Sequence, residues 1–295
     1  MTRKLLIVFT AAISLMYFGT TAEAGPSRVL IQEMGSVIGK DEVNIDLDVV
    51  SHTFNVVAAD DTTLGAGNAT LGGTTVSSVN VSLIDNVELR IGRLPGFRSY
   101  LTLPGIGEAP NNYGLTAKVA IPSVSGLAAW IGYGSATEED ITKGDSAGDV
   151  EGSSIRLGAA FTKGGIGPFI LNAAIGYGID QATTAGADMG DVKTIEASVA
   201  LLYPIRATLL AGIELNYADI SIGDTIPGVG KQEFDITVLS PAIGVRAIAG
   251  DFTIDAVVAL LSNQIEVDGS PSLGSLDTAS STVVGVPSLR VNYKF

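Results

Sequence analysis

The sequence predicts an all-β protein, a transmembrane up-and-down antiparallel β-barrel of about 12 strands. Three observations lead to this prediction. The chain is 46% hydrophobic but only 16% charged, and its 36 glycines accompany many Thr, Ser, Val and Ile residues, a mixture that favours strands and turns. Apolar and polar residues alternate in one segment after another. The links between these segments are alternately short and long, as in barrels whose hairpins have tight turns at one end and longer loops at the other.

Period-two alternation marks the candidate strands, because successive side chains of a strand point to opposite faces. The segments run roughly over 42–58, 75–84, 87–103, 113–121, 127–137, 153–163, 167–180, 192–203, 205–219, 232–247, 252–264 and 282–295. Tight links fall at 85–86, 122–126, 164–166, 204 and 249–251, and longer polar links at 59–74, 104–112, 138–152, 181–191, 220–231 and 265–281. Apolar parity changes near Ser240-Pro241 and near Ser51 and His52, so we expect a bulge at each place.

The N-terminus carries the pattern of a secretory signal peptide. Arg3 and Lys4 precede an uncharged apolar run from Leu5 to Phe18, and small residues at Ala22 and Ala24 suit cleavage by a signal peptidase. A membrane anchor is the alternative, but the run is short for the ~20 residues that a spanning helix needs. We therefore expect a signal peptide over 1–24, a periplasmic segment or small plug over 25–41, and the barrel over 42–295.

The chain ends in a strict alternation that places Leu289, Val291, Tyr293 and Phe295 on one face. This ending resembles the C-terminal strand signal of Gram-negative outer-membrane β-barrel proteins. The stretches "VSLIDNVELRIG" and "NYGLTAKVAI" are similar to hairpins of porin-like or transporter-like barrels. The resemblance implies a bacterial outer-membrane location, an assembly signal read by the barrel insertion machinery, and surroundings of lipid and lipopolysaccharide.

Aromatic residues agree with a membrane-spanning wall. In the segment from Phe169 to Tyr177 the two aromatics share a parity and are separated by roughly 20 Å along the membrane normal, which suits a lipid band with an aromatic at each edge. A secreted β-sandwich is the alternative fold, with the same apolar residues in its interior. Alternating loop lengths and a terminal Phe295 favour the barrel.

The opposite parity would line the interior of the barrel. Its charged lumen-lining candidates are Arg90, Lys118, Arg156, Glu196, Arg206, Glu214, Asp235, Arg246, Asp255 and Arg290. Several bases, among them Arg206 and Arg246, fall near short turns, and a basic zone there would favour anionic solutes in an open path. The alternative is that inward bases and acids form ion-pair networks that fill the barrel, because a buried charge requires a partner.

The sequence motifs give little support for an enzyme. The stretch "GDSAG" at 144–148 matches a nucleophile-elbow pattern, but no histidine follows it, and the only histidine is His52. The acidic loop over 138–151 lacks the spacing of an EF-hand. No cofactor-binding fingerprint and no metal site are expected, and a net charge of −14 disfavours nucleic acid as a partner. The chain has no cysteine, so disulfides and thiolate metal sites are excluded.

Two functions remain for a barrel of this kind. The first is a porin-like channel or transporter for small polar solutes, favoured because about 12 strands enclose more interior than loop display requires. The alternative is a non-conducting structural or adhesive barrel whose surface loops carry the function.

The terminal alternation yields a direct prediction about assembly. Deleting Phe295, or replacing Tyr293 and Phe295 together by alanine, should reduce insertion into the outer membrane, because the apolar face of the last strand is lost. Membrane fractionation measures this, with Ser288→Ala as a control on the opposite parity. Normal insertion of the double variant would remove the basis for a terminal signal.

Overall fold

A computed structural model describes residues 30, 33–58, 71–96, 113–138, 150–184, 187–226, 230–268, 278–285 and 288–295. The strands are β1 (Glu42–Ala58), β2 (Leu71–Ile84), β3 (Val87–Arg93), β4 (Tyr113–Ala120), β5 (Leu127–Glu138), β6 (Val150–Ile166), β7 (Phe169–Thr184), β8 (Ala187–Arg206), β9 (Leu209–Ile226), β10 (Gly230–Ala249), β11 (Phe252–Asp268), β12 (Thr278–Gly285) and β13 (Ser288–Lys294). Each of the predicted strand segments has a counterpart among them, so the all-β prediction is confirmed.

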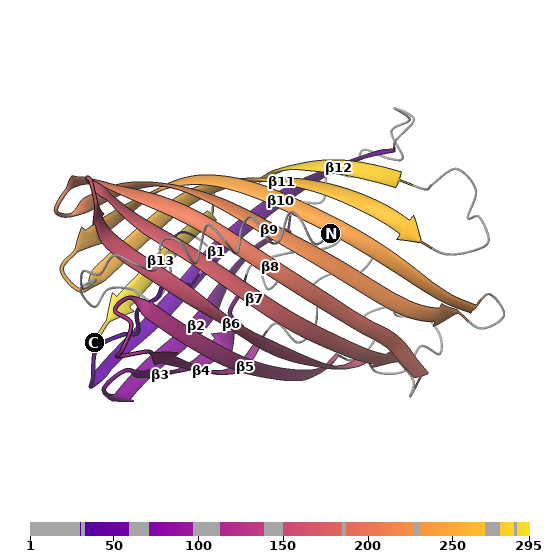
Figure 1. The fold of residues 1–295 in the computed structure, drawn as a ribbon, viewed down its shortest axis with the longest axis horizontal. Coiled ribbons are helices and arrows are strands. Elements are labelled where there is room, and N and C mark those ends of the chain that lie inside the picture. The colour runs from indigo at the N-terminus through magenta and orange to yellow at the C-terminus, as the bar shows by residue number, and fades with distance from the viewer. Residues whose placement is uncertain are drawn as a thin grey trace.

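The strands form one closed antiparallel barrel (Figure 1). Segments β12 and β13 occupy the same position in the wall, because both pair with β11 on one side and with β1 on the other. The wall therefore has 12 strands, as predicted. The last strand closes on the first with Ile45 opposite Tyr293, and the amide of Phe295 donates to the carbonyl of Val43 at 2.8 Å. Closure gives every strand of the wall a hydrogen-bonded neighbour on both sides, although β3 pairs with β2 only from Ser78 onward.

Short turns gather at one end of the barrel. The hairpins β2–β3, β6–β7, β8–β9 and β10–β11 turn there, at the left in Figure 1, and the C-terminus lies at the same end. Residues with positive φ make these tight turns, including Asn86 at 66° and Gly250 at 59°. Asparagine and glycine adopt this left-handed conformation with little strain.

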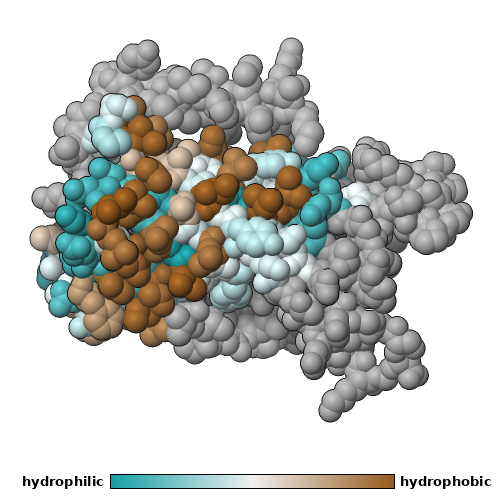
Figure 2. All heavy atoms as spheres, turned by 90° about the horizontal axis from the view of Figure 1, so that it is seen from below, coloured by the Kyte–Doolittle hydropathy of each residue, from teal (hydrophilic) through white to brown (hydrophobic). Residues whose placement is uncertain are grey.

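The two faces of the wall differ in polarity. Along β3, the side chains of Leu89 and Ile91 are exposed on the outside, whereas Glu88 and Arg90 are buried on the inside. Figure 2 shows an apolar band on one side of the molecule, bordered at the short-turn end by hydrophilic residues. Apolar side chains face outward because lipid would surround them there, and polar side chains face the interior. Among the described residues, no helix is long and apolar enough to cross a membrane.

One expectation about strand regularity is wrong. No bulge occurs near Ser240-Pro241, since β10 keeps a single register against β9 from Gly230 to Ala247. Ile236 and Val238 instead point into the interior, where both are buried. Asp235 then falls on the outward parity, half-buried and accepting a hydrogen bond from Ser221 at 2.6 Å. The prediction that Asp235 lines the interior is therefore wrong.

The third strand is shorter than predicted. β3 ends at Arg93, and Leu94, Pro95 and Gly96 leave the wall and are buried. Proline cannot donate a ladder hydrogen bond, and Gly96 has a φ of 102°, a conformation that extended strands do not use. These three residues are called the strap below, because they lie against the inner wall: Pro95 Cδ lies 3.1 Å from where a Cβ at Gly132 would be.

A register change does occur near Ser51 and His52. Val49 pairs with Leu289 and His52 with Gly285, so the partner strand has one residue more than β1 over this stretch.

The topology makes a prediction about sidedness. Epitope tags inserted near Asp145, Ala185 or Gly269 should bind antibody on intact cells, because these positions follow strand ends opposite the short turns. Tags near Gly165 or Gly250 should remain inaccessible until the outer membrane is permeabilised. Accessibility of the second set alone would invert the barrel, and equal accessibility of both sets would contradict a membrane-spanning wall.

Candidate functional site

The N-terminal segment lies inside the barrel at the short-turn end. We use the name inner segment for residue 30 together with residues 33–39. Its backbone bonds to side chains on three strands: Leu30 donates to Glu214 Oε2 at 3.2 Å, Gly35 to Thr162 Oγ1 at 2.7 Å and Ile38 to Glu88 Oε2 at 3.2 Å. These partners belong to β9, β6 and β3, so the inner segment contacts widely separated parts of the wall.

A buried carboxylate attaches the inner segment to two bases. Glu33 receives hydrogen bonds from Arg90 Nη1 at 2.6 Å and Arg90 Nη2 at 2.9 Å, and from Lys118 Nζ at 3.1 Å. Arg90 also donates to Glu88 at 3.1 Å and to Asn80 at 2.8 Å. The side chains of Glu33, Arg90 and Lys118 are at most 2% exposed. Charges so far from water require partners, so each group depends on the others.

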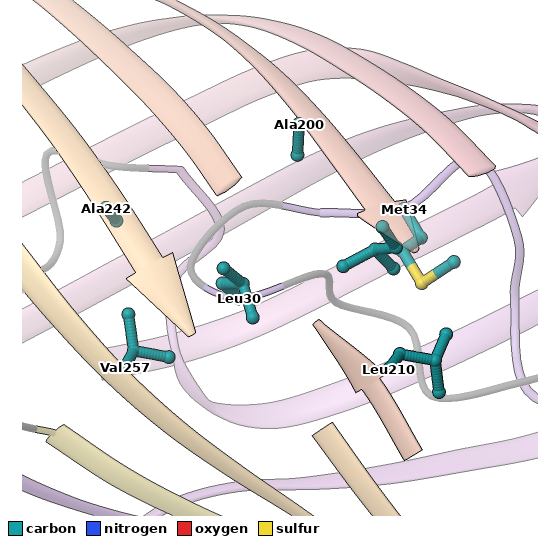
Figure 3. Packing of buried hydrophobic residues seen from close by; sticks show 7 residues of the cluster. Leu30, Met34, Ala200, Leu210, Ala242 and Val257 are labelled. Carbon is teal, nitrogen blue, oxygen red and sulfur yellow. The ribbon is translucent and has the colours of Figure 1, made fainter. Parts of the chain in front are cut away.

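An apolar seat holds the other side of the inner segment (Figure 3). The seat is a buried cluster of Leu30, Met34, Ala200, Leu202, Leu210, Ala242 and Val257. Glycines in the adjoining wall make room for it, because a Cβ at Gly244 would lie 3.0 Å from Leu30 Cδ2 and one at Gly212 would lie 3.2 Å from Leu30 Cδ1. Larger residues at these positions would push Leu30 off the wall.

Gly35 lets the inner segment pass close to the wall. A Cβ at this position would collide with the carbonyl oxygen of Gly126 and would lie 2.6 Å from the backbone nitrogen of Thr162. Asn172 adds a polar contact beside this point, since its Nδ2 donates to the carbonyl oxygen of Glu33 at 3.0 Å.

A second charged cluster lies on the wall near the C-terminal strand. Asp255 accepts from Arg246 Nε at 2.7 Å and Nη2 at 3.0 Å, and from Arg290 Nε at 3.0 Å. All three side chains are buried. Two of the bases expected to form a basic zone thus share one carboxylate, and Lys118 is paired with Glu33.

The middle of the barrel holds a third ion pair. Arg156 Nη2 lies 2.6 Å and 2.8 Å from the two carboxylate oxygens of Asp180, which also accepts from the hydroxyl of Ser154. Glu196 lies on the neighbouring part of the wall, next to Gly96 of the strap.

The predicted interior residues divide into three groups. Buried on the interior face are Arg90, Lys118, Arg156, Glu196, Glu214, Arg246, Asp255 and Arg290. Arg206 is exposed at the end of β8, beside a register irregularity at 204–206, and Asp235 lies on the other face. That these residues line a path for solutes stays a prediction.

Sequence reasoning missed Glu33, Thr162 and Asn172 as members of the site. Glu33 could have been noticed as the only acidic residue of 25–40, the segment before the first strand. Its bases on β3 and β4 could not be inferred from sequence, because only folding brings them together. The "GDSAG" stretch at 144–148 and most of the acidic loop lie outside the described residues. Within the described ranges, no group of three His, Cys, Asp or Glu residues could hold a metal ion.

The C-terminal residues form an aromatic cluster on the outside of the barrel. The Tyr293 ring lies 4.6 Å from that of Phe252 and 4.5 Å from that of Phe295, measured between centroids. Phe169 and Tyr203 form a similar pair at 5.6 Å. Both sets lie at the short-turn end, as expected of an aromatic girdle at a membrane interface.

A closed 12-stranded antiparallel barrel with an apolar outer face and a charged interior is the architecture of outer-membrane β-barrel proteins. No protein-family model matches the sequence, and no curated protein matches it.

Solved structures with a similar fold include a hydrocarbon channel, an autotransporter translocator domain and an outer membrane protein. The CymD monoaromatic hydrocarbon channel has 11% identity and a TM-score of 0.40, over 87% of this chain and 89% of that chain. The translocator domain of autotransporter NalP from Neisseria meningitidis has 11% identity and a TM-score of 0.37, over 99% and 95%. The outer membrane protein OprG from Pseudomonas aeruginosa has 12% identity and a TM-score of 0.30, over 89% and 99%. At these identities the likeness concerns the fold alone.

The Glu33 cluster leads to a prediction about stability. Glu33→Gln should destabilise the folded barrel by about 3 kcal/mol, because Arg90 and Lys118 lose a buried counter-charge. The temperature at which the compact form disappears on heat-modifiability gels measures the effect.

Lys294→Gln is the matched control for this experiment. It breaks an ion pair with Glu42 in which the lysine side chain is 47% exposed, and exposed pairs contribute about 0–1 kcal/mol. Equal thermal stability of Glu33→Gln and Lys294→Gln would contradict a structural role for the buried cluster.

Proposed function

We propose that this protein is an outer-membrane channel or transporter for small polar solutes, in which the inner segment acts as a plug. One observation carries the proposal: part of the interior at the short-turn end is filled by residues 30 and 33–39, which belong to no strand of the wall. An eight-stranded barrel can fill its interior with side chains, whereas 12 strands enclose more space. A separate segment fills that additional space.

The contacts of the plug support a role in gating. They include hydrogen bonds to wall side chains, ion pairs, apolar contacts and one isolated β-bridge at Glu33, but no continuous strand pairing over residues 33–39. The plug could therefore leave without unpairing the wall. Small residues at 200, 212, 242 and 244 face it, so its departure would leave room at this place.

The charges give the short-turn end little selectivity for anions. Lys118 is paired with Glu33, and Arg246 and Arg290 share Asp255, so these pairings leave at most one of the three positive charges uncompensated. Other features complete the proposal: residues 1–24 are removed during export, the insertion machinery reads the C-terminal strand, and the barrel carries no catalytic site.

A non-conducting structural or adhesive barrel is the second candidate. The buried ion pairs favour it, since a network such as Arg246–Asp255–Arg290 fills and stabilises a barrel without any need for a solute path.

Single-channel recording separates the two candidates. In planar bilayers, a variant lacking residues 25–39 should show larger and steadier conductance than the full mature chain, because the plug no longer occupies the interior. Lys40→Gln, a change at the exposed rim next to the plug, should conduct like the unchanged protein. Refolding is checked by heat modifiability. If the refolded deletion variant shows no conductance, the channel proposal is wrong and the structural barrel is favoured.

A further inference from the structure

The interior wall in the middle of the barrel is unusually rich in small residues. Three neighbouring rows cross strands β5 to β10 in register. The first row is Gly132, Arg156, Gly178, Thr194, Ile220, Ile236; the second is Trp130, Gly158, Gly176, Glu196, Ala218, Val238; the third is Ala128, Ala160, Ala174, Ser198, Asn216, Ser240. Glycine or alanine therefore occupies every position on β7 in these rows.

Three large side chains lie flat across these small residues. Cε2 of Trp130 is 2.7 Å from where a Cβ at Gly158 would be, and Cζ of Arg156 is 3.0 Å from the equivalent point at Gly178. Cγ of Glu196 is 2.8 Å from the equivalent point at Gly176. The indole, the guanidinium and the carboxylate are thus placed side by side along the wall of β6 to β8.

Several buried polar atoms on this wall have no hydrogen-bond partner. Arg156 is 2% exposed, and its Nε and Nη1 atoms are both unpartnered although Nη2 bonds Asp180. The hydroxyls of Thr194 and Ser198 on β8 are also buried and unpartnered. The third row continues this pattern, since Ser240 Oγ and Asn216 Oδ1 lack partners as well. A buried polar group without a partner is rare, and a bound solute or water is the usual explanation.

The unpartnered atoms specify a ligand that both accepts and donates hydrogen bonds. The Arg156 nitrogens only donate, the Asn216 oxygen only accepts, and the three hydroxyls do both. The site has no net positive charge, because Asp180 neutralises Arg156 and Glu196 lies in the next row. An anion would be repelled, and a purely apolar molecule would leave every polar atom unpaired.

We propose that this wall binds a neutral polyhydroxyl solute, such as a monosaccharide or a sugar alcohol. Hydroxyl groups of the solute satisfy Arg156, Thr194 and Ser198, and the solute lies beside Trp130, which packs with Ala160 and Ala174. The strap reaches this site, since Gly96 lies against Glu196. The inference rests on the proposed channel function only for the route by which the solute arrives, and binding can be measured without conduction.

Trp130 provides the probe, because it is the only tryptophan in the chain. The full mature chain is refolded in detergent and titrated separately with glucose and with mannitol while tryptophan emission is recorded. We expect a saturable change in emission for at least one of them. The double substitution Thr194→Val with Ser198→Ala should weaken binding by about tenfold, because two hydrogen bonds to the solute are lost. The matched control is Thr253→Val, an interior threonine on β11 outside this site, which should leave the affinity unchanged.

A second variant keeps the test decisive if the double substitution does not fold. Gly178→Ala adds a Cβ that displaces the Arg156 guanidinium, and it should also weaken binding. A response to lactate as strong as that to glucose, or no saturable response to either polyhydroxyl probe, would overturn the proposal. Sugar binding without conductance would contradict the channel function and leave this site standing. Conductance without sugar binding would contradict this site and leave the channel function standing.

Discussion

The buried pairing of Glu33 with Arg90 and Lys118 is the interaction on which the interior arrangement depends. Lipid outside the wall requires apolar side chains there, so the polar half of each strand faces inward. Charges inside must then neutralise one another. On the wall, Glu88 pairs with Arg90, whereas Lys118 pairs with Glu33 of the inner segment. The inner segment therefore supplies a negative charge that bases of the wall require, in addition to filling space.

The same constraint explains the distribution of small residues. Where the inner segment passes, Gly35, Gly212 and Gly244 allow backbone and side chains to approach closely. Farther from the short turns, Gly158, Gly176 and Gly178 let long side chains lie against the wall. Both regions combine room with polar atoms held by a rigid ladder, which is what a solute path or a solute site needs. The proposed plug and the proposed mid-barrel site therefore both depend on small residues in the wall.

Sequence alternation predicted the barrel, its strand number and most of its short turns, because periodicity directly reports which side chains face lipid. The turn expected at Pro204 lies instead at 207–208, after β8 has continued to Arg206. It failed for Asp235, since the argument assumed that apolar residues face outward, whereas Ile236 and Val238 are buried inside. It also extended β3 past Arg93, where Pro95 ends the ladder. The partners of Glu33 were beyond its reach, because the contact depends on how the barrel closes around the inner segment.

The central claim is that the inner segment is seated inside the barrel by its contacts with the wall. Hydrogen exchange of the amides of Leu30, Gly35 and Ile38 tests it most directly, because these amides donate to Glu214, Thr162 and Glu88. The account predicts that they exchange far more slowly than in an unfolded peptide, and that Glu33→Gln speeds their exchange while the strand amides stay protected. Exchange of these three amides at the unfolded rate in the unchanged protein would contradict the account.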